Sequence, residues 1–248
     1  MTGPRVAVVS PVHGNEATLP ALADRLAAAL AGRPWRLRLV IDASPDGSLA
    51  VARALAEADP RIAVTDLPVN VGQHAALAEG LDAEPDADVW VCLDADLQDP
   101  PEAVPGLLDR LAAGDVGAVF AGRRGGYESP ARRLTGTLHR RLAAGLTGLP
   151  PDAGAFLALD GRVRAAVLTA MADEAAPSVV LGVARARVPV ASVPVARDRR
   201  PVGRSAWTGR ARLAQSARSL GWALRVRGRP AVSVPSAGGP ARSCSRGG

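Results

Sequence analysis

Short apolar runs alternate with stretches of helical periodicity along the first half of the chain. Apolar runs of strand length predict buried strands, and the longer Ala- and Leu-rich stretches between them predict amphipathic helices. The predicted strands are Arg5–Pro11, Arg36–Ile41, Arg61–Asp66, Val89–Leu93 and Val116–Ala121. The predicted helices are Leu19–Leu30, Leu49–Ala58, Ala75–Leu81 and Glu102–Ala113. This alternation indicates right-handed βαβ units and a mostly parallel sheet.

The pattern is weaker after Gly122. The elements expected there are helices at Arg132–Ala144, Arg162–Met171 and Ala206–Arg227, and strands at Gly154–Leu159 and Arg187–Val195. Pro189 and Pro194 place the last of these strands at an edge of the sheet, because proline cannot donate to a strand ladder. From Gly228 on, Gly, Pro, Ser and Arg dominate, which is typical of a disordered tail. We therefore expect one α/β domain over residues 1–227, ending in an amphipathic, Arg-rich helix, and a disordered tail over residues 228–248.

The most informative stretch follows the predicted strand Val89–Leu93 and reads DADLQDPPE. Its first two carboxylates, Asp94 and Asp96, lie at the carboxyl end of a buried strand, where α/β sheets bind ligands. Mg²⁺ prefers oxygen ligands and commonly takes one or two carboxylates together with phosphate oxygens and water. A bare Asp-X-Asp is also typical of a solvated acidic turn. The strand before it and the Gln-Asp-Pro-Pro-Glu after it favour a divalent cation bound together with a substrate diphosphate.

Polar residues follow two other predicted strands. The loop from Pro11 to Glu16 sits where it can contact a nucleotide base; a plain turn, with Glu16 beside a helix N-terminus, fits equally well. Asp42 can accept hydrogen bonds from a base or ribose, or can simply form a turn. The segment Asn70–Gly80 contains small residues that let the backbone approach a ligand. His74 in it is expected to be a helix-start residue, because no second histidine stands at metal-ligand spacing.

Arginines gather after the strand Val116–Ala121. Arg123 and Arg124 follow the strand tip, and Arg132 lies at the start of the next helix. Clustered guanidinium groups bind phosphate oxygens in a bidentate manner, although a charge run is more often a solvated face. The loop 201–208, which contains Arg204, is either a flap over a diphosphate or an ordinary linker.

Charge and amino-acid composition limit the classes of ligand that the chain is expected to bind. The net charge is +6, and all 30 basic residues are arginine, which excludes lysine chemistry such as a Schiff base. A positive charge suits nucleotide diphosphates, phosphate-bearing acceptors or an anionic membrane surface. Nucleic acid fits the charge too, but no aromatic–basic platform or helix-turn-helix pattern supports it, so none is expected.

Cysteine use and hydropathy bear on location. Cys92 lies in a predicted core strand and Cys244 in the tail, so we expect no disulfide and a cytoplasmic protein. We expect no signal peptide, because no basic segment followed by an apolar stretch stands at the start. No uncharged apolar run approaches the roughly 18 residues of a membrane span.

Together the motifs resemble family 2 glycosyltransferases of the GT-A fold, a Rossmann-like architecture, and within them the dolichyl- and polyprenyl-phosphate sugar transferases. The matching blocks occur in the family's order over about residues 5–225. They read PVHGNEATLP, DASPDGS, NVGQHAALAEGL, LDADLQDPPE, GRR, RRLTGTLHRRL and VGRSAWT. The resemblance implies a nucleotide-binding half at 1–122 and an acceptor half at 123–227, and an inverting, metal-dependent transfer of a sugar to an acceptor, chiefly a polyprenyl phosphate.

The resemblance also implies residue roles. The residues expected to be catalytic are Asp94, Asp96, Arg123 and Arg132. Those expected to bind the nucleotide sugar are Pro11, Val12, Glu16, Asp42, Gln73, Asp94, Ala95, Arg124 and Arg204. Mg²⁺ or Mn²⁺ is expected at Asp96 and Gln98. Many relatives carry C-terminal membrane helices, and this chain shows none. It is therefore expected either to be soluble or to touch the inner face of the membrane peripherally, through the Arg-rich last helix.

Three departures from the family pattern keep alternatives open. The usual Val-Asp-Asp-Gly-Ser reads Val40-Ile41-Asp42-Ala43-Ser44, the usual first-loop tyrosine is His13, and Gly-Asp-Phe-Arg reads Gly154-Ala155-Phe156-Leu157. The alternatives are a soluble natural-product glycosyltransferase and a non-catalytic nucleotide-sugar binding protein. A nucleotidyltransferase is disfavoured, because no Gly-rich signature with a lysine follows the first strand. The sequence leaves the sugar, the base, the acceptor and the oligomeric state open.

Overall fold

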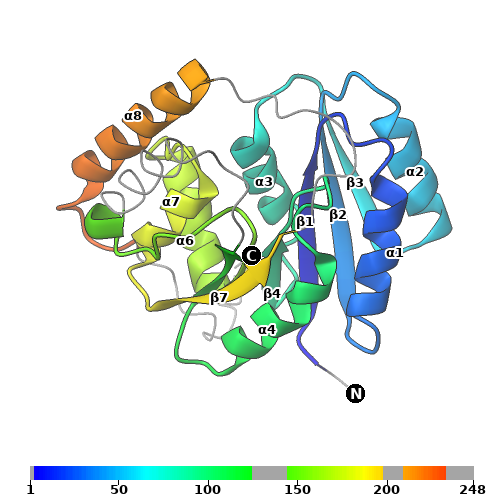
Figure 1. Cartoon of the computed structure of the whole chain (residues 1–248), viewed down its shortest axis with the longest axis horizontal. Coiled ribbons are helices and arrows are strands. Elements are labelled where there is room, and N and C mark those ends of the chain that lie inside the picture. The colour runs from blue at the N-terminus through cyan, green and yellow to red at the C-terminus, as the bar shows by residue number, and fades with distance from the viewer. Residues whose placement is uncertain (1–2, 125–143, 198–208, 233–248) are drawn as a thin grey trace, which may run out of the picture.

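A seven-stranded mixed sheet forms the centre of the molecule, with helices on both faces (Figure 1). The computed structural model describes residues 3–124, 144–197 and 209–232, and for residues 123–124 and 209–216 it describes the backbone alone. The strand order is β3-β2-β1-β4-β6-β5-β7. The strands are β1 (Val6–Val12), β2 (Trp35–Asp42), β3 (Ile62–Leu67), β4 (Val89–Cys92), β5 (Ala118–Arg124), β6 (Leu157–Asp160) and β7 (Val190–Ala196).

The helices connect and cover these strands. They are α1 (Leu19–Ala29), α2 (Ser48–Ala58), α3 (Gln73–Asp82), a 3₁₀ turn η1 (Pro101–Ala103), α4 (Val104–Ala112), α6 (Gly161–Ala172), α7 (Val179–Val183), a 3₁₀ turn η2 (Ala184–Ala186) and α8 (Gly209–Val226). Every strand predicted from the sequence is present, with ends shifted by a few residues. The expected helix after the DADLQDPPE stretch begins as η1 and continues as α4.

Strand direction sets where the loops gather. Strands β1, β2, β3 and β4 are mutually parallel, as predicted. Strand β6 pairs antiparallel with both β4 and β5, a reversal that the sequence pattern did not reveal. Two reversals make β5 parallel to β4, and β7 pairs parallel with β5 at the edge of the sheet, as its prolines predict. The carboxyl ends of β1, β2, β4 and β5 therefore lie on one edge.

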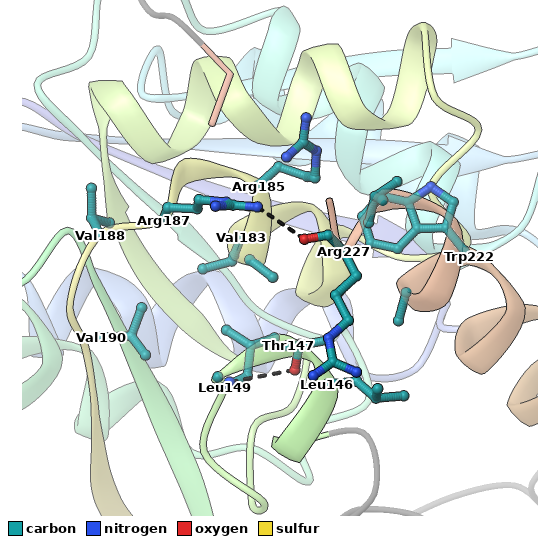
Figure 2. Close-up of a pocket in the computed structure, with 14 residues that line it drawn as sticks. Leu146, Thr147, Leu149, Val183, Arg185, Arg187, Val188, Val190, Trp222 and Arg227 are labelled. Carbon is teal, nitrogen blue, oxygen red and sulfur yellow. Dashed lines mark hydrogen bonds between the residues drawn. The ribbon is translucent and has the colours of Figure 1, made fainter. Parts of the chain in front are cut away.

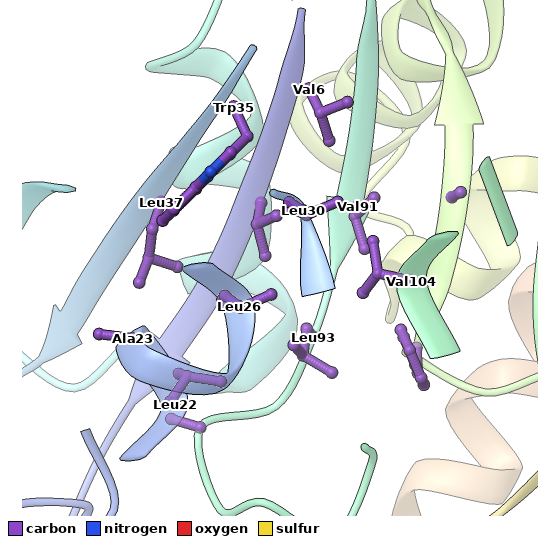
Figure 3. Packing of buried hydrophobic residues seen from close by; sticks show 14 of the residues in the cluster. Val6, Leu22, Ala23, Leu26, Leu30, Trp35, Leu37, Val91, Leu93 and Val104 are labelled. Atoms are coloured by element: carbon purple, nitrogen blue, oxygen red, sulfur yellow. The ribbon is translucent and has the colours of Figure 1, made fainter. Parts of the chain in front are cut away.

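Two hydrophobic clusters cover the two faces of the sheet. One joins the sheet to α1, α2 and α4, with Leu22, Leu26 and Leu37 fully buried in it (Figure 3). The other joins the opposite face to α3, α6 and α7. Alternate residues of each strand feed the two clusters, as the period of two requires. Gly80 of α3 serves this packing, because a Cβ there would lie 2.3 Å from the Val9 side chain.

A third, smaller cluster holds the end of the described chain. This C-terminal cluster consists of Ala170, Ala176, Leu181, Trp222, Ala223 and Val226. Residues 228–232, which the sequence assigns to the tail, belong to the described structure, and Val232 N donates to the Arg185 carbonyl at 3.2 Å. Residues 233–248 of that tail, and most of the predicted helix Arg132–Ala144, lie outside the described residues. Within the described part of the chain, we find no helix that combines the length and the apolar character needed to span a bilayer.

Candidate active site

Four loops meet at the carboxyl edge of the parallel strands. We call them the carboxyl-edge loops and define them as residues 13–18, 42–48, 70–73 and 94–99. They follow β1, β2, β3 and β4, whose parallel course brings their ends together. Most of the site residues predicted from the sequence belong to these loops.

Asp42 at the end of β2 is almost completely buried, with 3% of its surface exposed. Its Oδ1 accepts from Val71 N at 2.6 Å and its Oδ2 from Gly72 N at 2.9 Å. Both carboxylate oxygens therefore hold the turn that starts α3. Sequence reasoning left Asp42 open between a nucleoside ligand and a turn-forming residue, and these contacts give it an orienting role inside the protein.

The same turn reaches the acidic stretch after β4. Gln73, the first residue of α3, donates from Nε2 to Asp94 Oδ1 at 2.6 Å. A continuous path of contacts thus runs from Asp42 through residues 71–73 to Asp94. It links Asp42 and Asp94, which lie 52 positions apart in the sequence.

Burial alternates along the loop after β4. Leu93, Ala95, Leu97 and Asp99 are buried, whereas Asp94, Asp96 and Gln98 are partly exposed. The loop therefore presents the predicted cation ligands Asp96 and Gln98, together with Asp94, on its more open side. The backbone of this loop is strained at Leu97, because its φ of 58° lies in the left-handed region that residues other than glycine rarely adopt. Gln98 N donates to Asp96 Oδ1 at 3.0 Å across this turn.

Two buried hydroxyl groups hold the backbone of the loop after β4. Ser10 Oγ donates to the Leu93 carbonyl at 2.7 Å, and Thr18 Oγ1 donates to the Ala95 carbonyl at 2.6 Å. Sequence reasoning missed both residues. No local signal marks them, because their partners lie 77 or more positions away.

The first loop is tied to the second. Glu16 Oε2 accepts from Gly47 N at 3.0 Å, and Glu16 N donates to Asp46 Oδ2 at 3.1 Å. A Cβ at position 47 would lie 2.8 Å from the Glu16 carboxylate, so a larger residue there would displace this carboxylate. Burial opposes ionisation of Asp46, but hydrogen bonds from Ser44, Ser48 and the Glu16 amide hold its pKa well below the usual range.

His74 is set into the protein one residue after Gln73. Burial lowers its pKa to about 4, so its imidazole is neutral at pH 7. Its Nδ1 is buried and has no hydrogen-bond partner within the described residues. The Nδ1 atom of His13, by contrast, has a partner, since it lies 2.9 Å from the Asp42 carbonyl oxygen.

The acidic side chains suit a cation that arrives with a substrate. Across residues 3–122, 144–197 and 217–232, whose side chains are described, no three His, Cys, Asp or Glu groups lie close enough to hold an ion by themselves. Asp94 and Asp96 are partly exposed at a strand end. Such a pair fits Mg²⁺ or Mn²⁺ completed by phosphate oxygens and water, and does not form a closed protein cage.

The remaining predicted residues divide into three groups. Pro11, Val12 and Ala95 are buried, and the Val12 and Ala95 side chains belong to the core. Arg123 and Arg124 end β5 at the same edge, and their backbone pairs with β7. Arg132, Arg204 and the loop 201–208 lie outside the described residues.

The third departure from the family pattern, Gly154-Ala155-Phe156-Leu157, places two apolar side chains in the core. Ala155 is 7% exposed and Leu157 is completely buried in β6. Their apolar side chains therefore pack inside the protein.

One acidic residue near β5 escaped the sequence reasoning. Asp152 Oδ2 accepts from Ser192 Oγ at 2.9 Å, and a Cβ on Gly122 would come within 2.2 Å of the same oxygen. Gly122 immediately precedes Arg123 in β5. Asp152 thus lies against the strand that leads to the predicted phosphate-binding arginines.

A separate hollow of about 400 Å³ lies between the end of α8, the segment 146–149 and the start of β7 (Figure 2). Its walls include Leu149, Val183 and Trp222, and arginines 185, 187 and 227 stand around it. Arg187 closes one side by donating from Nη2 to the carbonyls of Arg227 at 3.2 Å and Arg229 at 2.6 Å. Among the predicted site residues whose side chains the structure describes, none lines this hollow.

Known proteins of similar sequence show which family the chain resembles. The model of "Glycosyl transferase family 2" matches residues 7–154. An undecaprenyl-phosphate 4-deoxy-4-formamido-L-arabinose transferase of Pseudomonas aeruginosa strain LESB58 is 42% identical over 124 residues, which cover 48% of this chain and 36% of that protein. The enzyme of the same name from Shewanella sediminis is 37% identical over 149 residues, 58% of this chain and 44% of that protein. The chain thus matches less than half the length of these relatives.

Solved structures show the same fold. Glucosyl-3-phosphoglycerate synthase from Mycobacterium tuberculosis, in complex with Mn²⁺, UDP and phosphoglyceric acid, aligns with a TM-score of 0.68 and 24% identity, over 92% of this chain and 80% of that one. The same synthase with Mg²⁺ and UDP aligns with a TM-score of 0.63 and 22% identity, over 91% and 79%. The family model covers more than half of the chain, including all four carboxyl-edge loops, and the chain belongs to glycosyl transferase family 2.

Proposed function

We propose that this chain transfers a sugar from a nucleotide diphosphate donor to a polyprenyl phosphate, with inversion at the sugar carbon. Asp96 and Gln98 hold Mg²⁺ or Mn²⁺ together with the donor's phosphates. The observation that carries the proposal is the contact path from Asp42 through residues 71–73 to Asp94. It joins the loop after β2 to the loop after β4, so that a nucleotide can bridge them.

The relatives support the donor and the acceptor. The relatives include undecaprenyl-phosphate sugar transferases, and solved structures with the same fold contain UDP with Mn²⁺ or Mg²⁺. The net charge of the chain is +6, which attracts negatively charged phosphate groups. Both proposed substrates, the nucleotide diphosphate donor and the polyprenyl phosphate acceptor, carry such groups.

The chain's own residues orient the donor. Gln73 fixes the Asp94 carboxylate before any ligand binds, and the buried hydroxyls of Ser10 and Thr18 fix the backbone on either side of it. A pre-oriented site spends less binding energy on ordering its own groups. The cation, when bound, neutralises the negative charge that develops on the leaving diphosphate.

The acceptor needs little activation in this scheme. A polyprenyl phosphate is already an anion, so its oxygen attacks the sugar carbon without a strong general base. Attack from the face opposite the departing diphosphate inverts the configuration. We assign Arg123, Arg124, Arg132 and Arg204 to the phosphates of donor and acceptor, because guanidinium groups bind such oxygens in pairs.

Contact with the inner face of a membrane is part of the proposal. Leu224 on α8 is 59% exposed, and the neighbouring Arg225 is exposed as well. An exposed apolar side chain beside arginines suits the surface of an anionic bilayer.

The test has two stages. Calorimetry with UDP, GDP and TDP, with and without Mn²⁺, identifies the donor class; we expect one nucleotide to bind and the cation to tighten it. Radiolabelled donor is then offered to a polyprenyl phosphate and to soluble acceptors, and the anomeric configuration of the product is read by NMR.

The outcomes separate the alternatives. Transfer to the lipid phosphate with inversion supports the proposal. Transfer only to soluble acceptors indicates a natural-product glycosyltransferase, and nucleotide binding without transfer or hydrolysis indicates a non-catalytic binding protein. A chain that binds no nucleotide under any condition refutes all three.

A further inference from the structure

A buried ion pair holds the loop after β4 to the last strand. Arg197 Nε donates to Asp99 Oδ1 at 2.6 Å, and Arg197 Nη2 donates to Asp99 Oδ2 at 3.0 Å. The Asp99 side chain is 3% exposed and that of Arg197 is 22% exposed. Arg197 directly follows β7, 98 positions along the chain from Asp99. The two parallel bonds fix both distance and orientation, as bidentate guanidinium–carboxylate pairs do.

Asp99 lies in the same short loop as the proposed cation ligands but faces the other way. Asp94, Asp96 and Gln98 are on the partly exposed side of this loop, whereas Asp99 is buried with Leu97. One anchored residue thus stands three positions from Asp96 and one from Gln98.

The loop needs such an anchor because its backbone is strained. Leu97 has a φ of 58°, and a side chain in this region costs on the order of 1–3 kcal/mol. Such a conformation persists only when its surroundings impose it. On the amino-terminal side, Thr18 holds the Ala95 carbonyl. On the carboxyl-terminal side, Asp99 and Arg197 hold the chain.

We propose that Asp99 and Arg197 form a positioning clamp, which keeps residues 94–98 in the strained conformation that binds the cation with its nucleotide. This inference rests on the proposed function for the identity of the ligand. The clamp itself touches neither cation nor sugar, so it acts only through the loop. Partners that orient metal ligands in this way typically contribute 10- to 100-fold to metal affinity.

The protein contains a matched control for a purely structural role. Arg185 pairs with Glu174 in the same bidentate manner, at 2.7 and 2.9 Å, and the two side chains are 6% and 11% exposed. This second pair lies beside the C-terminal cluster, away from the carboxyl-edge loops. Breaking either pair leaves a buried charge, so both should destabilise the fold. Only the clamp should alter the loop.

The experiment compares Asp99→Asn and Arg197→Lys with Glu174→Gln and Arg185→Lys. The Lys variants keep the charge and lose the paired geometry, so they stay folded where a full deletion fails. Mn²⁺ binding in the presence of UDP is followed by electron paramagnetic resonance, amide exchange of residues 93–99 by mass spectrometry, and unfolding by urea.

We expect the clamp variants to weaken Mn²⁺ binding about 10- to 100-fold and to speed exchange at the Gln98 amide. The control variants should lose similar stability but bind Mn²⁺ within twofold of the wild type. Unchanged exchange and binding in both clamp variants overturns the clamp, as does an equal loss in the control pair. A wild-type chain that binds no Mn²⁺ with UDP refutes the proposed cation site, and the exchange data then decide the clamp alone.

Discussion

The carboxyl-edge loops and the C-terminal cluster are held by opposite means. In the loops, polar side chains reach across to the backbone of other loops, as Asp42 does to residues 71 and 72 and Thr18 to Ala95. In the C-terminal cluster, Trp222 packs among aliphatic side chains from α6 and α7. Hydrogen bonds fix direction, whereas apolar burial supplies stability without direction. The difference indicates that changes in the loops should affect ligand binding, and changes in the cluster should affect folding.

Among the substitutions that test this difference between the two regions, Asp96→Ala should have the largest effect. We expect sugar transfer to fall about 1000-fold, because the cation loses a carboxylate ligand while the loop backbone remains. The measurement is transfer of radiolabelled sugar at saturating donor. Asp109→Ala, which removes an exposed carboxylate from α4, is the control and should retain activity. Equal activity in the two variants would exclude a role for Asp96 in binding the cation.

Trp222→Ala tests the other region. Trp222 is 1% exposed and its Nε1 donates to the Glu174 carbonyl at 3.0 Å. We expect the free energy of unfolding to fall by about 3–5 kcal/mol, the usual cost of truncating a buried aromatic side chain. Leu224→Ala on the same helix should change it by less than about 0.5 kcal/mol, since that side chain is exposed. Urea unfolding measures both, and nucleotide affinity at low temperature should be unchanged in either.

His74 should make stability depend on pH. Its pKa is about 4 in the folded chain against 6.5 for an exposed histidine, so the unfolded chain takes up a proton first on acidification. Stability from this residue is therefore complete above pH 6.5 and is lost as the pH falls toward 4, by at most about 3 kcal/mol. The stability difference between wild type and His74→Gln, measured by urea unfolding from pH 7 to 4.5, should shrink with acid. Stability curves of the wild type and His74→Gln that run parallel over this pH range would contradict the prediction.

Gln73→Ala removes one hydrogen bond, from Gln73 Nε2 to Asp94 Oδ1, from the contact path between Asp42 and Asp94. Without the Nε2 contact at 2.6 Å, the Asp94 carboxylate can turn away from its bound orientation, and we expect nucleotide affinity with Mn²⁺ to fall about tenfold. Calorimetry provides the measurement, and unfolding in urea should be nearly unchanged. If affinity stays at the wild-type value, Gln73 does not orient the site.

The smallest effect concerns backbone strain at Ala43. Its φ is 45°, in the left-handed region where a Cβ costs about 1–2 kcal/mol. Ala43→Gly should raise the free energy of unfolding by about 1 kcal/mol after the extra entropy of glycine is counted. Ala54→Gly, inside α2, should lower it by about the same amount. A decrease in both variants would show that position 43 is not strained.

Local patterns predicted much of this molecule well. The strands of the first half and the edge position of β7 follow from hydrophobic periodicity and proline placement, because both depend on neighbouring residues only. The position of Asp94 and Asp96 at a strand end follows from the same local signals. The antiparallel course of β6 does not, since a short apolar run carries no record of its direction.

Contacts between distant residues were beyond sequence reasoning. The sequence leaves Asp42 open between a nucleoside ligand and a turn-forming residue, and it does not reveal that the Asp42 oxygens accept from amides 29 and 30 positions later. The role of Ser10 and Thr18 beneath the loop, and the pairing of Asp99 with Arg197, depend on which loops the closed sheet brings together. No spacing along the chain encodes such partners.

By itself, the sequence determined the α/β class, the order of elements and the chemistry offered at the strand ends, because these depend on residue type and local period. The tertiary structure alone decided which of those side chains face the open edge and which are used to fix the loops. The physical reason is that burial and hydrogen-bond partners are set by long-range packing of the sheet, and packing turns Asp99 inward while it leaves Asp96, three residues earlier, partly exposed.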